Sequence, residues 1–372
     1  MNTAFPNRIT QCRQLAGLSK TDLANKLNLS VAAISQWENG TKNPTTDNLV
    51  LISRELNIPM QLLLTPIPHE VSCRGPITFR ARASVKTGIL RRQAQSLAEL
   101  AAEAFIWLEK RVSIPSAPMP EIAPSEPEES ADECRRVWGL GNRPISKLGE
   151  LFESKGIRLC SASFGDTRFD AFSCILSGRT FVFLGTVKQD RARSRFDAAH
   201  ELGHLVMHQH YSEEEFEKNA AELEKQANAF AASFLMPAET FSLDVVDASI
   251  EGFKRLKPKW GVSIQAMVMR AKDLELISEE TYERHVRNMS TQGWRRARGE
   301  PLDNFVPEIN RSVGKKSMEL LTSGNSINLW DIPNELPLPD SILESVFEIN
   351  LRAMVPKELD NIIVLHRATH LD

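Results

Sequence analysis

The segment from His200 to His204 carries the clearest chemical signal in the sequence. It reads His-Glu-Leu-Gly-His. Because helical residues four apart lie on one face, His200 and His204 can bind the same Zn²⁺ ion. Glu201 lies beside them, where its carboxylate can act as a general base toward a zinc-bound water. The spacing therefore predicts a zinc-dependent hydrolase, which needs a third protein ligand.

Three downstream residues are candidates for that third ligand: His208, His210 and Glu224. His210 would complete an HExxHxxGxxH arrangement, but Met207 replaces the glycine that turns the chain back. His208 lies one turn too far along the helix axis for a shared tetrahedral site, and we expect both histidines at the surface or beside substrate. Glu224 begins a second helical run with small residues on its packing face, so its carboxylate can project onto the first helix.

Two further residues have candidate roles near the metal. Asn228 lies four residues after Glu224 on the same face, where it can fix a ligand imidazole through a hydrogen bond; the alternative is an ordinary surface residue. Cys174 lies in a strand-like run ahead of the metal helix. One hypothesis is that its thiolate occupies the fourth zinc position and silences the enzyme until it is oxidised. The alternative, which we favour, is a cysteine packed inside a strand.

The region from Phe172 to Pro237 resembles the ImmA/IrrE family of metallopeptidases. The resemblance lies in the segments DAFSCILSGRTFVFL, RSRFDAAHELGHLVMH and EKQANAFAASFLMP, and it extends more weakly to about Trp294. It implies a zincin-like fold with the zinc ligands His200, His204 and Glu224 and with Glu201 as the base. Members of that family include peptidases that cleave helix-turn-helix repressors. Since a fold alone does not establish turnover, a non-proteolytic sensor of a metabolite or protein partner is the alternative function.

The N-terminal region has the pattern of a helix-turn-helix. Ser19 can cap a first short helix, with Asp22 three residues later, and Ser30 can cap a second helix that buries Ile34 and Trp37. Two short helices at this spacing present the start of the second helix to base edges in the major groove. DNA binding is the favoured function, and the alternative is that the helices serve only protein contacts.

The N-terminal region resembles the XRE/Cro family of helix-turn-helix proteins over about 55 residues, most clearly from Ser30 to Gly40. The family pattern is matched by Ser30, Ile34, Ser35, Trp37, Glu38 and Gly40. The resemblance implies that bases or phosphates are contacted by Lys20, Val31, Ala32, Ser35 and Gln36, and phosphates by Arg13 and Lys42. Gln36 is the strongest candidate for a base contact, because a carboxamide can bond bidentately to adenine. The apolar Val31 and Ala32 favour thymine-methyl contacts or weak specificity.

The elements between and around these motifs divide the chain. From Leu90 to Leu108, apolar residues recur in steps of four and three and predict one helix, whose narrow seam either packs on its own chain or forms a dimer. Five prolines between Ser113 and Ser130 favour an extended linker, which is also an accessible cleavage region. Strand-like runs at 157–160, 171–176 and 180–184, with a turn at 177–179, precede helical periodicity at 193–235 and indicate an α+β domain.

The composition of the chain bears on the number of domains, on nucleic-acid binding and on the cellular compartment. The 372 residues are 42% apolar and 25% charged, which is enough for two or three domains with real cores. The net charge of −3 says little about nucleic acid, because acids and bases nearly balance. Five cysteines without a CxxC pair, and no signal-peptide pattern or long apolar run, indicate a cytoplasmic protein without a membrane partner.

We therefore expect a multidomain chain: an all-α helix-turn-helix domain, and an α+β zincin-like metallopeptidase domain with a helical C-terminal extension. The expected boundaries are 1–66 for the DNA-binding domain, 67–130 for a helical spacer and Pro-rich linker, 131–299 for the peptidase domain, and 300–372 for an extension without assigned chemistry. The expected cofactor is Zn²⁺. The expected partners are a double-stranded DNA operator, a protein substrate that is a repressor or the chain itself, and a second copy in a homodimer.

Overall fold

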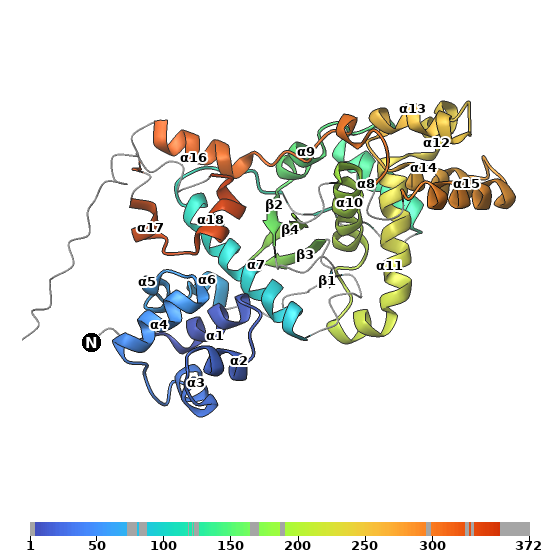
Figure 1. The fold of residues 1–372 in the computed structure, drawn as a ribbon. Coiled ribbons are helices and arrows are strands. Elements are labelled where there is room, and N and C mark those ends of the chain that lie inside the picture. Colours follow the sequence, from blue (N-terminus) through green and yellow to red (C-terminus); the bar gives the residue numbers. More distant parts are fainter. Residues whose placement is uncertain are drawn as a thin grey trace, which may run out of the picture.

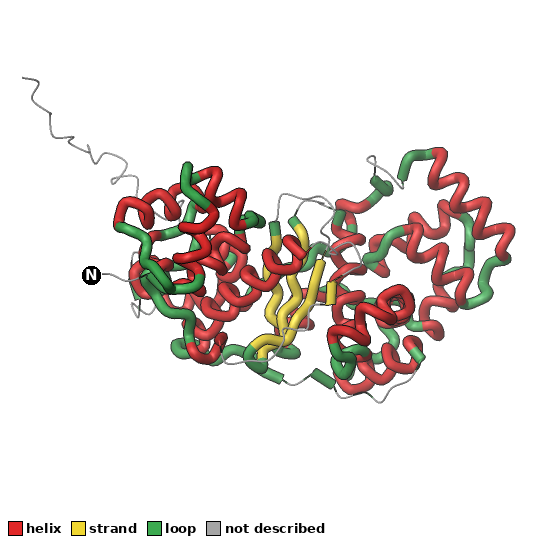
Figure 2. The backbone as a smooth tube through the Cα atoms, turned by 90° about the horizontal axis from the view of Figure 1, so that it is seen from below, coloured by secondary structure: helices red, strands yellow, loops and turns green. Residues whose placement is uncertain are grey.

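The computed structural model of the chain describes residues 4–72, 80–81, 88–117, 119–120, 122, 126–163, 171–186, 190–294, 299–323, 327–328 and 331–349. Figure 1 shows a helical N-terminal unit at one end, a small sheet near the middle, and helices stacked beyond the sheet. The sheet lies between helices on both of its faces (Figure 2). None of the described helices is long and apolar enough to cross a membrane.

The N-terminal unit is all α. Its helices are α1 (Pro6–Leu15), α2 (Lys20–Lys26), α3 (Val31–Glu38), α4 (Thr46–Leu56), α5 (Met60–Leu63) and α6 (His69–Ser72). The predicted caps are confirmed: the Ser19 hydroxyl accepts a hydrogen bond from Asp22 N, the Asp22 carboxylate accepts one from Ser19 N, and Ser30 caps α3. Ile34 and Trp37 are buried beneath α3, as their spacing predicts. The segment therefore folds as a helix-turn-helix.

The sheet has four strands in the order β1-β3-β4-β2. They are β1 (Arg80–Ala81), β2 (Ile157–Ala162), β3 (Ala171–Leu176) and β4 (Arg179–Gly185). The predicted hairpin joins β3 to β4 antiparallel through Ser177 and Gly178, both with positive φ, as a tight hairpin turn requires. β2 pairs with β4 in parallel, and β1 pairs with β3 antiparallel.

Two helices cover the two faces of the sheet. On one face lies α10 (Arg191–Met207), which packs on β3 and β4, and behind it are α11 (Glu213–Leu235), α8 (Pro127–Trp138) and α9 (Leu148–Ser154). On the other face lies α7 (Gly88–Glu109), where Phe105 meets Phe181 of β4 edge to face at 5.8 Å. The strands alternate their side chains between these two layers, so every β3 residue faces either α10 or α7.

The remaining helices extend the layer behind α10 and return to α7. Beyond α11 lie α12 (Ala238–Asp244), α13 (Ile250–Trp260), α14 (Ile264–Asp273) and α15 (Glu279–Thr291). The C-terminal region contains the short η2 (Asp303–Phe305), α16 (Val313–Ser323), α17 (Ile332–Glu335) and α18 (Asp340–Phe347). α18 packs against α7 and β2, so the extension joins the hydrophobic core on that side of the sheet.

α7 is fixed to the N-terminal unit and to the sheet at the same time. Near its middle, Glu103 is buried and receives two hydrogen bonds from Arg8 of α1, at 2.6 and 2.7 Å. At its end, Glu109 pairs with Arg158 of β2 and Arg179 of β4, each at 2.6 Å. The predicted apolar seam therefore packs on its own chain, against α1, β3 and α18.

Candidate metal centre

The two helices that carry the metal motif pack unusually close together. Gly203 of α10 faces Phe230 of α11, and a Cβ at Gly203 would lie 3.0 Å from the Phe230 ring. Ala227 and Ala231 are fully buried on the same side of α11. Small residues at this contact let the backbones approach, which brings Glu224 within reach of α10.

His200, His204 and Glu224 converge on one point. The two Nε2 atoms are 3.1 Å apart, and each lies 3.5 Å from a different oxygen of the Glu224 carboxylate. An ion with tetrahedral ligands about 2.0–2.1 Å away holds its donor atoms about 3.4 Å from each other. The distance between the two Nε2 atoms and the shortest distance from each of them to the carboxylate are close to that spacing, with a different Glu224 oxygen nearest each histidine, so these residues fit a zinc ion.

The hydrogen bonds behind the imidazoles orient the Nε2 atoms of His200 and His204 toward the metal position. His200 Nδ1 lies 3.0 Å from Asn228 Oδ1. Because that oxygen is an acceptor, Nδ1 carries the proton and the Nε2 lone pair points toward Glu224. Asn228 thus takes the position that its spacing predicts, and it fixes the tautomer of His200.

His208 is buried behind His204, although we expected it at the surface or beside substrate. Its Nδ1 lies 2.9 Å from His204 Nδ1, and its Nε2 lies 3.0 Å from Gln226 Oε1. The Gln226 oxygen accepts, so His208 Nε2 donates, His208 Nδ1 accepts from His204, and His204 keeps Nε2 for a ligand. Phe216 of α11 packs over both rings, which explains the burial. His210, in contrast, is exposed.

Glu224 has a buried carboxylate oxygen without a hydrogen-bond donor among the described residues. Its Oε1 atom is buried and accepts no hydrogen bond from any residue that the structure describes. A buried carboxylate oxygen without a donor is costly, and a bound cation would satisfy it. The donor set, its spacing and this orphaned oxygen all agree with a zinc site.

Glu201 faces the sheet rather than α11. Its carboxylate is buried, and Ser173 of β3 donates a hydrogen bond to its Oε2 at 2.7 Å. This contact orients the carboxylate beside the two histidines. Sequence reasoning did not identify Ser173, because nothing in its local pattern separates it from other strand residues.

Cys174 lies on the face of β3 that points away from α10, which favours the packed strand cysteine over the regulatory thiol. Adjacent strand residues point to opposite faces. Ser173 faces α10 and Glu201, whereas Cys174 packs in the core on the α7 side with Phe105 and Phe181. Burial raises the pKa of the Cys174 thiol above its usual range, which disfavours the thiolate that a metal needs.

The recognition helix presents the expected face. Val31, Ala32 and Lys42 are exposed, and Ser35, Gln36 and Lys20 are partly exposed. These side chains lie around α3, and Lys20 Nζ is 3.4 Å from Glu38.

Arg13 is placed differently from the prediction. Its guanidinium is buried, donates to both oxygens of Glu38 at 2.6 and 3.1 Å, and also donates to Leu18 O. The side chain ties α1 to the end of α3 and is not available to a DNA phosphate in this structure.

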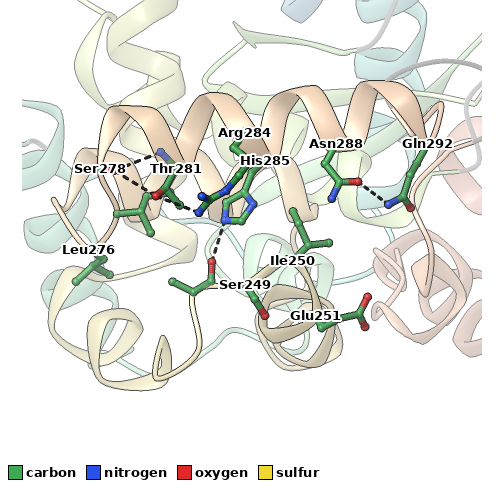
Figure 3. Close-up of a pocket in the computed structure, with 12 residues that line it drawn as sticks. Ser249, Ile250, Glu251, Leu276, Ser278, Thr281, Arg284, His285, Asn288 and Gln292 are labelled. Carbon is green, nitrogen blue, oxygen red and sulfur yellow. Dashed lines mark hydrogen bonds between the residues drawn. The ribbon is translucent and has the colours of Figure 1, made fainter.

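A pocket lies elsewhere, in the helical layer beyond α11. It has a volume of about 720 Å³ and lies between the start of α13 and one side of α15. Figure 3 shows Arg284, His285 and Asn288 on α15 above Ser249 and Glu251. The His285 Nε2 donates to Ala248 O at 2.9 Å. None of the metal-site residues lines this pocket, so its size does not mark the site of chemistry.

Two family models match the chain. Residues 9–63 match a helix-turn-helix model. Residues 152–272 match a peptidase M78 model described as an IrrE N-terminal-like domain, and this range includes His200, Glu201, His204 and Glu224. M78 is a zinc-type peptidase family. No curated protein matches the chain.

Proposed function

Because the chain joins an XRE-type helix-turn-helix domain to an ImmA/IrrE-like peptidase domain, we propose that it is a DNA-binding transcription regulator with a zinc-dependent endopeptidase. The endopeptidase cleaves a regulatory protein, or the chain itself, in response to a signal. The observation that carries the proposal is the convergence of His200, His204 and Glu224 within 4.8 Å, with Glu201 buried beside them.

The roles of the residues follow from this geometry. His200, His204 and Glu224 would hold the zinc, which when bound polarises a peptide carbonyl and acidifies water. Glu201 takes a proton from the attacking water and returns it to the leaving amine. Ser173 orients the Glu201 carboxylate through its hydrogen bond, and Asn228 holds the His200 ring. Burial of these groups limits access of bulk water to the reacting bond.

We propose that the DNA partner is a double-stranded operator read by α3, chiefly through Gln36 and the neighbouring residues Lys20, Val31, Ala32, Ser35 and Lys42. A homodimer would place two such helices on half-sites about one helical turn apart. The proposed location is the cytoplasm, where an operator and a repressor substrate would both be present.

The test separates chemistry from metal binding. Glu201→Gln keeps the shape of the side chain but removes the base, so cleavage of fluorescently labelled casein should fall at least about 100-fold while zinc content stays near that of wild type. Glu224→Ala should lose the zinc, as measured by elemental analysis. A Glu201→Gln variant that still regulates transcription normally in cells would overturn the peptidase proposal in favour of a non-proteolytic sensor.

A further inference from the structure

The sheet edge beside the metal site is filled by the chain's own residues. β1 pairs antiparallel with β3, with Arg80 opposite Ser173 and Ala81 opposite Phe172. Figure 1 shows β1 along the outer side of β3. Ser173 is also the residue that bonds Glu201 at 2.7 Å. Since antiparallel partners have Cα atoms about 4.5–5.5 Å apart, the Arg80 backbone lies within about 10 Å of the Glu201 carboxylate.

This edge is where an extended substrate would bind. An edge strand presents unpaired N–H and C=O groups, and a peptide that adds a strand to it is held along its main chain. Without β1, β3 would be the sheet edge next to Glu201. A protein substrate that uses the β3 edge therefore needs the place that Arg80 and Ala81 occupy.

β1 belongs to the connection between the helix-turn-helix unit and the rest of the chain. β1 lies between α6, which ends the helix-turn-helix unit at Ser72, and α7, which begins at Gly88. Both flanking helices contact the folded core, α6 through Glu70 and α7 through Glu103, and β1 itself pairs with β3, so β1 meets the site at a high effective concentration. A cut at β1 would break the covalent link between the DNA-binding unit and the peptidase.

Part of the Pro-rich segment is less well placed than β1 for self-cleavage. Met119 and Pro120 are buried, and Ala117 packs so closely on Gly156 that a Cβ there would lie 2.6 Å from Ala117 N. A buried backbone cannot enter an active site without local unfolding. Ser113, Pro115 and Ser116 are exposed, so only the part of the segment that is buried or packed on Gly156, at Ala117, Met119 and Pro120, is less well placed than β1.

We infer that the tether strand Arg80–Ala81 is an internal substrate of the peptidase. This inference rests on the proposed function. The reaction is hydrolysis: water adds across one peptide bond at β1, the C–N bond breaks, and a new carboxylate and a free amine form. Glu201 carries the proton from the water to the leaving nitrogen, so no oxidant or further reactant is needed.

The test uses the full chain with Zn²⁺, in wild-type and Glu201→Gln forms, followed by intact-mass spectrometry and N-terminal sequencing of any fragment. Wild type should give two fragments with the cut at or beside Arg80–Ala81, at a rate independent of protein concentration, and Glu201→Gln should stay intact. The double substitution R80P, A81P removes both N–H groups of the strand. It should slow self-cleavage at least tenfold, while cleavage of added casein is not reduced.

Other outcomes overturn the inference in distinguishable ways. A wild-type chain that cuts casein but remains intact would refute the internal substrate and leave the proposed function standing. If R80P, A81P then cut casein faster than wild type does, β1 would be an inhibitor of the site. Cleavage confined to the segment from Ser113 to Ser130 would also refute the inference. A zinc-loaded chain that cuts neither itself nor casein would refute the proposed function.

Discussion

Replacing His208 with alanine should weaken zinc binding without removing any ligand. In the structure His208 Nδ1 accepts a hydrogen bond from His204 Nδ1 at 2.9 Å, and His208 Nε2 donates one to Gln226 Oε1 at 3.0 Å. His204 is fully buried. His208→Ala therefore leaves the His204 N–H without a partner and frees the ring to rotate away from the metal position.

The size of the effect follows from that buried donor. An unsatisfied buried polar group costs about 1–3 kcal/mol, and loss of such a partner behind a ligand histidine typically weakens metal binding about 10–100-fold. His208→Gln should recover much of the affinity, because its amide oxygen can accept from His204. His210→Ala serves as the matched control, since His210 is exposed.

The assay is competition for Zn²⁺ between each variant and a chromophoric chelator, with urea unfolding of the metal-free proteins to confirm that all are folded. The reasoning is refuted if folded His208→Ala binds zinc as tightly as wild type. It is also refuted if His208→Gln is as weak as His208→Ala, because cavity formation would then account for the loss.

Four other changes probe the DNA face, the link between α1 and α3, the α7 anchor and the contact between α10 and α11. Gln36→Ala should weaken operator binding by about 1–3 kcal/mol in a mobility-shift assay. Arg13→Ala should instead lower the midpoint of urea unfolding, because the Arg13 side chain ties α1 to α3. If Arg13→Ala changed only the salt dependence of DNA binding, the buried position of Arg13 would be contradicted. Burial alone would raise the pKa of Glu109, and hydrogen bonds from its two arginines hold that pKa below its usual range. Its contribution to stability is therefore complete above pH about 4.5 and is lost as the pH falls through the lowered value. Glu109→Gln should lower the free energy of unfolding at pH 7 by about 1–3 kcal/mol in urea unfolding. The difference from wild type should narrow in acid. A difference that does not change with pH would show that the charge of Glu109 is not its cause. Gly203→Ala should lower the melting temperature, since its Cβ would meet Phe230 at 3.0 Å, and unchanged melting with full zinc content would show that the helices can separate.

Much of the fold was predictable because its signals are local. The caps at Ser19 and Ser30 depend on residues three positions apart, and the helical position of His200 and His204 depends on a spacing of four. The hairpin between β3 and β4 was also predictable, because its turn residues adjoin the strands they connect. The convergence of Glu224 on the two histidines required the family resemblance in addition to spacing.

The misplaced residues depend on contacts between distant segments. His208 is buried because Phe216 and Gln226 of α11 cover it. Arg13 of α1 forms an ion pair with Glu38 at the end of α3, so its charge is neutralised inside the N-terminal unit. For Cys174 the packed strand position that we favoured agrees with the structure; the thiol hypothesis required the opposite face of the sheet, and a shift of one residue reverses every side chain.

The position of α7 has a consequence for how such a chain can be rearranged in evolution. A recombination event that exchanged only residues 1–66 would bring in a foreign surface opposite Glu103 and leave that buried carboxylate without its arginine. The apolar residues Leu97 and Ala101 would also lose their matched partners. The segment that recombination can exchange intact is therefore the helix-turn-helix together with α7. New DNA specificity is gained more readily by substitutions on the exposed face of α3 than by replacing the helix-turn-helix domain.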